Sequence, residues 1–392
     1  MNKRMKKTVS LCLAALFILS CCVFSACSNM DSTPGPTEAP AAESPISGTP
    51  EPTADASEKH TPEPTGTPEP SAAPEEYIYR IDYSVIPDAI MPVLTEADIE
   101  AYFAVMEAFA KYETGVTVEA DDGIGNIYEL LDLCFPVFFA DVYDSSLTIT
   151  ENSISWSYNV DAAEHYRLIG EFEDIVLEKL DIVLNGEAKD SNELLKALVL
   201  YRRMTTEMIY DYPSQYHYLG EYTISESQYM NHCYDALTSE RGVCWCYARA
   251  YAFLLNHIGI EALTVSCDGG IGHHEWTMFF HDGSWFFADP TWDLGGSLSY
   301  FGITTVNRES VGYLYEDMRY FAGADHRVSD AFAINDTRFS SLNIGGYGTI
   351  DNYDFDYDNN LIVMNCLSYS SSGYGNITVI YDLATYTIAD ES

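Results

Sequence analysis

Large apolar residues recur every three or four positions from Tyr247 to Ile258, and Gly259 then interrupts the pattern. This spacing is typical of a helix that buries one face in a core. Glycine readily adopts the left-handed conformation found just past many helix ends. We therefore predict a helix over about 244–257, with Cys244 in its first turn.

Apolar and polar residues alternate in the stretches that follow this helix. Alternation of this kind predicts strands with one buried face, here at 262–266, 275–280 and 284–288. The last two stretches flank His281-Asp282-Gly283, and Asp-Gly is a strong signal for a hairpin turn. The sequence thus predicts a helix followed by a strand and a hairpin.

The expected hairpin brings two polar side chains together. Alternation puts His274 and Trp276 on one face of their strand. Asp289 closes the next strand, and Pro290 ends the pairing there because proline has no N–H for the ladder. We expect Asp289 to lie beside His274, within reach of an imidazole N–H.

Capping residues predict three helices upstream of this region. A side-chain acceptor followed three residues later by an acidic residue is the pattern of a capping box. Between the first two helices, Ser145–Trp156 alternates and predicts a strand pair. The pairs are Thr95 with Asp98, Asp161 with Glu164 and Asp190 with Glu193, and the helices are expected at about 96–112, 162–184 and 191–210.

Cys244, His274 and Asp289 are the residue types of a thiol acyl-transfer site, namely a nucleophile, a base and a group that orients the base. At a helix start, unpaired backbone N–H groups and the helix dipole favour a thiolate over a thiol. The same N–H groups can hold a developing oxyanion. We therefore predict these three residues to be catalytic, with the Cys244 N–H as one oxyanion donor.

The segments around these residues resemble the core of the transglutaminase-like superfamily, bacterial branch. Several fixed spacings agree at once over about 191–330, which is more specific than any lone motif. The Cys244-Trp245 pair also resembles the nucleophile segment of papain-like proteases. The matching segments are Gly242-Val243-Cys244, Tyr247-Ala248, Gly259-Ile260, His274-x-Trp276, Asp282-Gly283-x-Trp285 and Asp289-Pro290-Thr291-Trp292-Asp293.

This resemblance implies an α+β fold with a papain-like, transglutaminase-like core, in which the nucleophile helix packs on an antiparallel sheet. In the family a cysteine attacks an amide carbonyl, a histidine is its base and later its acid, and an aspartate orients the histidine. Carried over, these roles fall on Cys244, His274 and Asp289. No cofactor and no metal is implied.

The second oxyanion donor has three candidates upstream of the helix, Tyr210, Tyr212 and Gln228. Tryptophans near the motif are first of all core side chains, and they are also our expected cleft-lining residues. These are Trp245, Trp276 and Trp292.

Each catalytic assignment has an alternative. Cys244 could be a buried structural thiol. His273 could serve as the base in place of His274, although it is expected in a turn or at the rim of the cleft. Asp289 could simply cap the turn before Pro290.

A second thiol, Cys246, stands where bacterial relatives often carry glycine. Residues two apart on a helix point about 200° away from each other, so only one thiol can face the histidine, and the match with Trp245 selects Cys244. The two cysteines with His273 and His274 are zinc-ligand types, but Cys-x-Cys with adjacent histidines lacks a usual zinc spacing.

Asp354-x-Asp356-x-Asp358 begins like a calcium-binding loop. However, Asn359 replaces the glycine of the sharp turn, and Asn365 replaces the bidentate glutamate. We predict instead a polar strand face that runs into a turn.

The chain begins with a basic segment, Met1–Lys7, an apolar segment, Val9–Phe24, and the small residues Ser25-Ala26 before Cys27. This is the pattern of a secretory signal. Its end resembles a bacterial lipobox, which implies a signal peptide over 1–27 and a lipid on Cys27. Two cysteines just upstream compete for that role, and a plain signal peptide or an N-terminal membrane helix is the alternative.

Residues 28–76 are mostly Pro, Thr, Glu, Ala and Ser and contain hardly any large apolar side chain. Such a segment cannot bury enough surface to fold, and its prolines make it an extended spacer. It suits a disordered tether that holds a domain away from a membrane. We therefore expect an extracytoplasmic protein anchored to the cell membrane by lipid.

From Tyr77 onward the composition becomes apolar and aromatic, and about 315 residues remain for folded regions. We predict an N-terminal helical or mixed region at 77–190, a catalytic core at 191–330 and a β-rich region at 331–392. The last region is rich in Tyr, Ser, Gly and Asn and alternates at 361–366 and 377–381, which predicts a small antiparallel appendage.

The formal net charge is −41, and removal of the basic signal segment leaves −45. This acidity argues against nucleic acid and against peripheral binding to anionic lipid, and it favours neutral or cationic partners. Beyond the signal, the cysteines are scattered and show no disulfide framework.

Together these features predict an extracytoplasmic thiol-dependent amide hydrolase or acyltransferase that acts on a peptide, a protein or a cell-wall peptide. Hydrolysis is preferred because no amine-guiding feature is visible and an exposed thioester meets water at very high concentration. The alternatives are a transglutaminase that joins glutamine to amines and a cell-surface binding module without catalysis.

Overall fold

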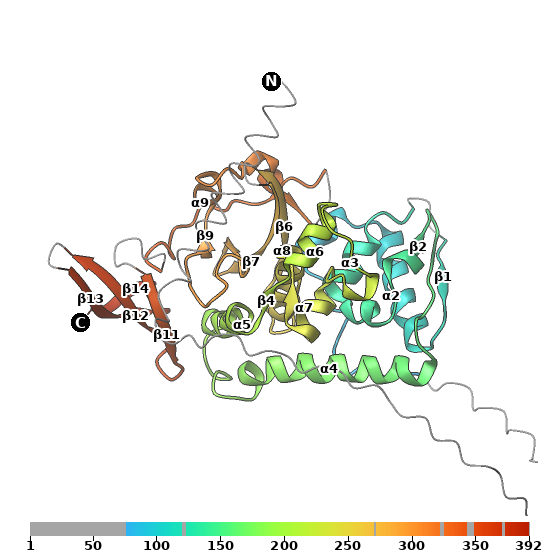
Figure 1. Cartoon of the computed structure of the whole chain (residues 1–392), viewed down its shortest axis with the longest axis horizontal. Coiled ribbons are helices and arrows are strands. Elements are labelled where there is room, and N and C mark those ends of the chain that lie inside the picture. The colour runs from blue at the N-terminus through green and yellow to red at the C-terminus, as the bar shows by residue number, and fades with distance from the viewer. Residues whose placement is uncertain are drawn as a thin grey trace, which may run out of the picture. The chain divides into compact units, whose positions relative to one another are not determined.

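Helix α8 (Cys244–Asn256) lies against a five-stranded antiparallel sheet in the computed structural model of the chain (Figure 1). Thr277 of the sheet fastens the helix, because its hydroxyl donates a hydrogen bond of 2.8 Å to the Ala248 carbonyl oxygen. Nearly every residue of α8 is buried, so the helix lies inside the core. The strand order is β10 (Arg319–Tyr320), β6 (Ala262–Gly269), β7 (Gly272–His281), β8 (Ser284–Ala288) and β9 (Phe301–Ile303).

The structure describes residues 76–119, 123–269, 272–321, 325–342, 349–370 and 373–391, and these belong to one compact unit. Within it, one hydrophobic core has members from all three regions that the sequence predicts. The predicted signal peptide, the lipidation site Cys27 and the tether up to residue 75 lie outside the described residues. None of the described helices is both long enough and apolar enough to cross a membrane.

The α8 helix ends as predicted. Gly259 adopts a left-handed φ of 82°, and the following N–H, from Ile260, donates to the Leu255 carbonyl oxygen at 3.0 Å. This arrangement satisfies a carbonyl that the helix end leaves free. It also turns the chain directly into β6.

The predicted hairpin is confirmed as β7 and β8. His281 pairs with Ser284, so only Asp282 and Gly283 lie between the strands. Both have positive φ, 46° and 79°, as a tight type I′ turn requires. β7 is longer than the predicted 275–280 because its pairing with β6 continues to Gly272.

Two of the three predicted upstream helices begin at their capping residues. At α2 (Glu96–Ala110), Thr95 and Asp98 each accept the other's backbone N–H at 3.0 Å. At α4 (Ala162–Leu184), the N-cap carboxylate of Asp161 accepts the N–H of Glu164 at 3.0 Å.

The third helix, α5 (Glu193–Glu207), differs from the prediction at both ends. Its cap is Asn192 rather than Asp190, because the Asn192 side chain accepts the Leu195 N–H at 2.8 Å. It ends before residue 210 because the chain becomes extended at Met208 and pairs as β4 (Ile209–Tyr210).

β4 pairs in parallel with β5 (Arg241–Gly242). Tyr210 lies opposite Gly242, two residues before Cys244. This short pairing therefore joins the end of α5 to the start of the nucleophile helix.

The predicted strand pair in Ser145–Trp156 is present as β2 (Thr148–Ile149) and β3 (Ser153–Ser155). β1 (Gly115–Thr117) completes a three-stranded sheet. The other helical elements are α3 (Ile127–Cys134), α6 (Tyr212–Tyr218), α7 (Cys233–Ser239), α9 (Thr305–Glu309), α10 (Val328–Ala331), η1 (Asp88–Val93), η2 (Pro136–Ala140), η3 (Asp144–Ser146), η4 (Glu226–Gln228) and η5 (Tyr315–Asp317).

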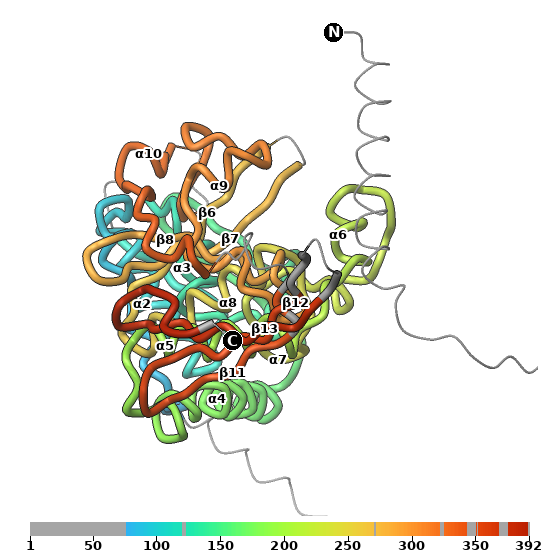
Figure 2. The backbone as a smooth tube through the Cα atoms, turned by 90° about the vertical axis from the view of Figure 1, so that its left-hand side faces the viewer, coloured from blue at the N-terminus to red at the C-terminus, as the bar shows by residue number. Residues whose placement is uncertain are grey.

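The C-terminal region forms a four-stranded antiparallel sheet, as predicted, and α6 stands at the edge of the backbone tube (Figure 2). Asp354 and Asp356 lie in its first strand and Asp358 lies in the turn that follows, so the prediction of a polar strand face is confirmed. The strands are β11 (Thr349–Asp356), β12 (Leu361–Ser370), β13 (Gly373–Asp382) and β14 (Thr387–Glu391).

Candidate active site

Cys244 is the first residue of α8, and only 4% of its surface is exposed. Burial is the strongest influence on its thiol and raises the pKa to about 12, although the backbone N–H groups of Glu275 and Trp245 face the sulfur and oppose this rise. The expectation that the helix start favours a thiolate is therefore wrong in this conformation, because lost hydration outweighs the N–H groups. The thiol is protonated at neutral pH.

His274 and Asp289 meet as the hairpin predicts. His274 Nε2 lies 2.6 Å from Asp289 Oδ2, and both residues are buried. Asp289 directly follows Ala288, which pairs with Thr277, so the end of β8 delivers its carboxylate to the face of β7 that carries His274.

The other oxygen of Asp289 accepts hydrogen bonds from the backbone of the turn that follows β8. Oδ1 accepts the backbone N–H groups of Thr291 and Trp292 at 3.1 and 3.2 Å. Asp289 therefore caps the turn beyond β8 and also holds His274. The capping interpretation and the orienting interpretation are both satisfied by one carboxylate.

Nδ1 of His274 remains for a proton from a thiol, because Nε2 is engaged with Asp289. Among the described residues, no hydrogen bond joins Cys244 Sγ to His274 in this conformation. The Cys244 sulfur instead faces the backbone N–H of Glu275, the residue that follows His274 in β7. Such contacts often shorten only when substrate is bound.

Aromatic rings hold the His274 imidazole in place. Trp292 stacks on it with ring centroids 5.1 Å apart and an angle of 18° between the planes. Trp276 and Tyr313 lie on further sides, with centroids at 5.8 and 5.9 Å. The imidazole therefore has little freedom to rotate away from Asp289.

Arg308, on α9, is a site residue that sequence reasoning missed. Its Nη2 lies 2.6 Å from Asp289 Oδ2, the same oxygen that His274 contacts, and the side chain is fully buried. The guanidinium carbon lies 4.3 Å from the centre of the Trp276 ring and 4.8 Å from that of Trp292. A buried carboxylate needs such a partner, but no local motif marks the arginine, which comes 19 residues after Asp289.

The charges around Asp289 keep it ionised. Burial acts to raise the pKa of Asp289, but the positive charges of His274 and Arg308 and their hydrogen bonds lower it to about 2. At neutral pH the site therefore holds a permanent carboxylate between two nitrogen donors.

The candidate oxyanion donors occupy different environments. Tyr210 pairs with Gly242, two residues before Cys244, and its pKa is raised by burial and by the nearby thiols of Cys244 and Cys246. Tyr212 is half exposed on α6, with its ring 5.0 Å from that of Tyr210. Gln228 is exposed at the end of η4, where its side-chain oxygen accepts the Ser225 hydroxyl at 2.8 Å. Tyr210 is thus the candidate beside the thiol.

A cleft of about 380 Å³ opens next to Cys244, and Trp245 lines it as predicted. Trp292 is partly buried and instead covers His274. The prediction that Trp276 lines the cleft is wrong, because Arg308 and neighbouring rings cover it completely. The cleft residues are Tyr128, Asp144, Tyr218, Tyr229, Asn231, Trp245, Arg249, His273 and Glu275.

The competing side chains point elsewhere. His273 lies at the cleft rim, with Nδ1 3.1 Å from the exposed carboxylate of Asp268. Cys246 Sγ faces the Met230 carbonyl oxygen at 3.6 Å. All described cysteines are unbridged, and in the described parts of the chain no three His, Cys, Asp or Glu side chains gather as a metal site would require.

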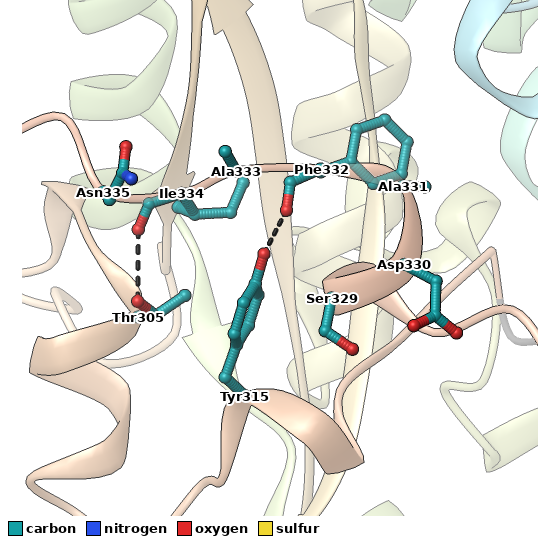
Figure 3. A pocket seen from close by; sticks show the side chains of 9 residues that line it. All are labelled: Thr305, Tyr315, Ser329, Asp330, Ala331, Phe332, Ala333, Ile334 and Asn335. Carbon is teal, nitrogen blue, oxygen red and sulfur yellow. Dashed lines mark hydrogen bonds between the residues drawn. The ribbon is translucent and has the colours of Figure 1, made fainter.

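A second hollow, of about 490 Å³, lies between α9, η5 and the segment around α10 (Figure 3). The Tyr315 hydroxyl and the Thr305 hydroxyl donate to the carbonyl oxygens of Phe332 and Ile334 across it. It is larger than the cleft beside α8, but no sequence neighbour of the three predicted catalytic residues lines it. None of those three residues lines the smaller cleft itself, but Trp245 and Glu275, which follow Cys244 and His274 in the chain, do. We therefore assign the chemistry to the side of the smaller cleft.

Comparison with known proteins agrees with this geometry. Residues 183–290 match the model of the transglutaminase-like superfamily, a span that contains α5, α8 and the β7–β8 hairpin. No curated protein matches the sequence.

Two solved structures resemble parts of the chain. One is a TGase, with 15% identity over 37% of this chain and 43% of that chain and a TM-score of 0.28. The other is a candidate cysteine protease from Cytophaga hutchinsonii, with 17% identity over 39% of this chain and 62% of that chain and a TM-score of 0.23. This chain thus spans less than two thirds of either protein. Through the family match, residues 183–290 are a transglutaminase-like domain.

Proposed function

We propose that this protein is an extracytoplasmic thiol-dependent amide hydrolase, anchored by a lipid on Cys27, that acts on a peptide or a cell-wall peptide. Cys244 is its nucleophile, His274 its base and Asp289 the group that orients the base. The observation that carries the proposal is the 2.6 Å contact of His274 Nε2 with Asp289, which leaves Nδ1 for the thiol.

In the first half-reaction, the Cys244 sulfur attacks the carboxamide carbon while its proton moves to His274. The carbonyl oxygen becomes an oxyanion, which the Cys244 N–H and Tyr210 stabilise. The carbon–nitrogen bond then breaks, His274 gives the proton to the leaving nitrogen, and a thioester remains on Cys244. Proton transfer accompanies attack because burial keeps the resting thiol protonated, with a pKa of about 12.

In the second half-reaction, His274 removes a proton from water, and the resulting hydroxide attacks the thioester carbon. The carbon–sulfur bond breaks, the sulfur regains its proton from His274, and a carboxylic acid leaves. Throughout both halves Asp289 stabilises the imidazolium that forms each time.

Ammonia release from a capped glutamine peptide tests this proposal. The wild-type protein should release ammonia and form the glutamate peptide, and Cys244→Ala should do neither. Release that survives in Cys244→Ala would contradict the assignment of the nucleophile. Adding a labelled primary amine separates the two acyl acceptors, since incorporation of the label would favour amine transfer over hydrolysis.

The anchor has its own test. A Cys27→Ala variant expressed with the full N-terminus should leave the membrane fraction, whereas the wild-type protein should remain there. Equal membrane retention of both would contradict lipidation at Cys27.

A further inference from the structure

Glu275 presents an unused carboxylate oxygen to the cleft beside Cys244. Only 3% of the residue is exposed, yet it lines the cleft. Its Oε1 accepts Arg249 Nε at 3.2 Å, and no donor among the described residues bonds to Oε2. Oε2 is not among the fully buried side-chain atoms that lack a partner, so it is open to the cleft and can accept a hydrogen bond from a ligand there.

Arg249 cannot serve as an anion site, because two carboxylates already neutralise it. One of its nitrogens pairs with the fully buried Asp132, and another with Glu275. The charge of the guanidinium is therefore directed into the protein rather than toward a bound molecule.

The remaining charges near the cleft leave it negative. His232 lies between Asp132 and Asp144, at 3.5 and 3.4 Å. Burial acts to lower the pKa of His232, but the two carboxylates raise it by more than burial lowers it, to about 10. His232 is therefore a cation at neutral pH. The carboxylates of Asp132, Asp144 and Glu275 thus face two cations, Arg249 and His232.

Two other acidic groups add to the negative side. Glu129 is near the same cluster, and burial raises its pKa. Asp268 is exposed beside His273 at the rim. Neither group brings a positive charge that could offset the carboxylates.

Aromatic rings form the outer wall of the cleft. The rings of Tyr218 and Trp245 are 4.9 Å apart, and His273 lies 6.3 and 6.4 Å from them. Aromatic faces attract cations, especially when a carboxylate lies nearby. The aromatic rings at the rim and the carboxylates deeper in the cleft therefore both favour a cationic group.

We propose that this cleft is a subsite for an ammonium group of the substrate, which Glu275 Oε2 and the rings of Tyr218 and Trp245 bind. The inference rests on the proposed function, because it names a group carried by the substrate of that same site. The backbone N–H of Glu275 faces the Cys244 sulfur, so the ammonium is bound on the side of β7 where the nucleophile lies. A bound ammonium is protonated and not nucleophilic, so it is a recognition group and not the acyl acceptor.

Equilibrium binding to the Cys244→Ser variant tests the subsite without any need for catalysis. The probes are capped dipeptide amides in which glutamine is joined on either side to lysine, norleucine or glutamate. An uncapped glutaminyl-norleucine amide tests whether an amino-terminal ammonium serves as well as a lysine side chain. We expect the best lysine peptide or the uncapped peptide to bind about tenfold more tightly than its capped norleucine counterpart.

Two substitutions in the cleft should remove this preference. Glu275→Gln keeps the oxygen that accepts from Arg249 but loses the charge, and it should bring the binding ratio close to one. Tyr218→Ala should reduce the ratio, whereas Tyr222→Ala should not, although the two tyrosines are similarly exposed, at 53% and 58%. Thermal unfolding of each variant checks that the fold is intact.

Equal binding of the charged and neutral peptides, or tighter binding of the glutamate peptide, would overturn the subsite. Failure of the proposed function has a different signature. In that case wild-type protein would form no acyl-enzyme with any of these peptides, while Cys244→Ser could still prefer the cation.

Discussion

Arg308 Nη2 and Asp289 Oδ2 lie 2.6 Å apart, and neither side chain has any exposed surface. His274 Nε2 meets the same oxygen at 2.6 Å. One carboxylate thus connects a guanidinium, held between two tryptophans, to the imidazole of the proposed base. Arg308 is therefore a positioning residue, which acts on His274 through Asp289.

Replacing Arg308 with glutamine should destabilise the fold by about 3–5 kcal/mol, because it leaves Asp289 as a buried charge with one partner fewer. Arg338 provides a matched control. It also pairs with an aspartate, Asp336, at 2.6 Å, but this pair is partly exposed. Arg338→Gln should therefore cost about 1 kcal/mol or less. Urea unfolding measures the free energy of unfolding of both variants. Equal losses in the two variants would contradict the idea that burial makes the Arg308–Asp289 pair more important.

The pH dependence of stability should report Asp289. Its pKa in the folded protein is about 2, lower than the value of about 3.9 expected when unfolded. Its charge therefore contributes stability above about pH 4, and that contribution is lost as the pH falls toward 2. The free energy of unfolding of wild type minus that of Asp289→Asn should shrink by about 2 kcal/mol over this window. A difference that stays constant from pH 5 to pH 2 would argue against a depressed pKa.

Tyr210→Phe should slow acyl transfer by about one to two orders of magnitude if its hydroxyl stabilises the oxyanion. Tyr212→Phe is the control, because this residue is half exposed on α6 and more distant along the chain from the β4–β5 pairing. The ratio kcat/KM for glutamine peptides distinguishes the two. Similar losses in both variants would remove Tyr210 as the specific donor.

Iodoacetamide should label Cys244 faster than the other described cysteines near neutral pH. It is the most exposed of them, at 4%, and its sulfur faces the backbone N–H of Glu275, the residue after the proposed base. The rate at Cys244 should drop in His274→Ala, because the proton then has no acceptor. Peptide mapping by mass spectrometry follows each site, and slow, uniform labelling would instead favour a binding module without catalysis.

Local pattern was sufficient for the elements that carry the proposed triad. The apolar spacing from Tyr247 and the stop at Gly259 identify α8, and Asp282-Gly283 identifies the hairpin. The hairpin then dictates that Asp289 meets His274, since a two-residue turn allows only one register. These features depend on residues close together in the sequence.

Features that depend on distant residues were missed or misplaced. Nothing near Arg308 reveals that it will meet Asp289, because α9 is placed by tertiary packing. Trp276 lies on the same strand face as His274, which led us to expect it in the cleft, yet Arg308 covers its ring. The Cys244 thiol has the helix position of a thiolate, but its pKa is set by burial, which no local pattern contains.

Competing local signals explain the error at α5. Asp190 and Asn192 are both good N-caps and stand two residues apart. The structure uses Asn192, whose own backbone N–H is held by the Asn360 side chain of the C-terminal sheet at 2.7 Å. A contact across the chain therefore decides between two local alternatives.

The central claim is that Cys244 forms a thioester with a carboxamide substrate, and mass spectrometry of a quenched reaction tests it most directly. Acid quenching of wild-type protein with a capped glutamine peptide should show the acyl adduct on the peptide that contains Cys244, with none in Cys244→Ser. His274→Ala should show much less adduct at the same time point. An adduct on another cysteine, or turnover of the peptide without any adduct on Cys244, would contradict the account.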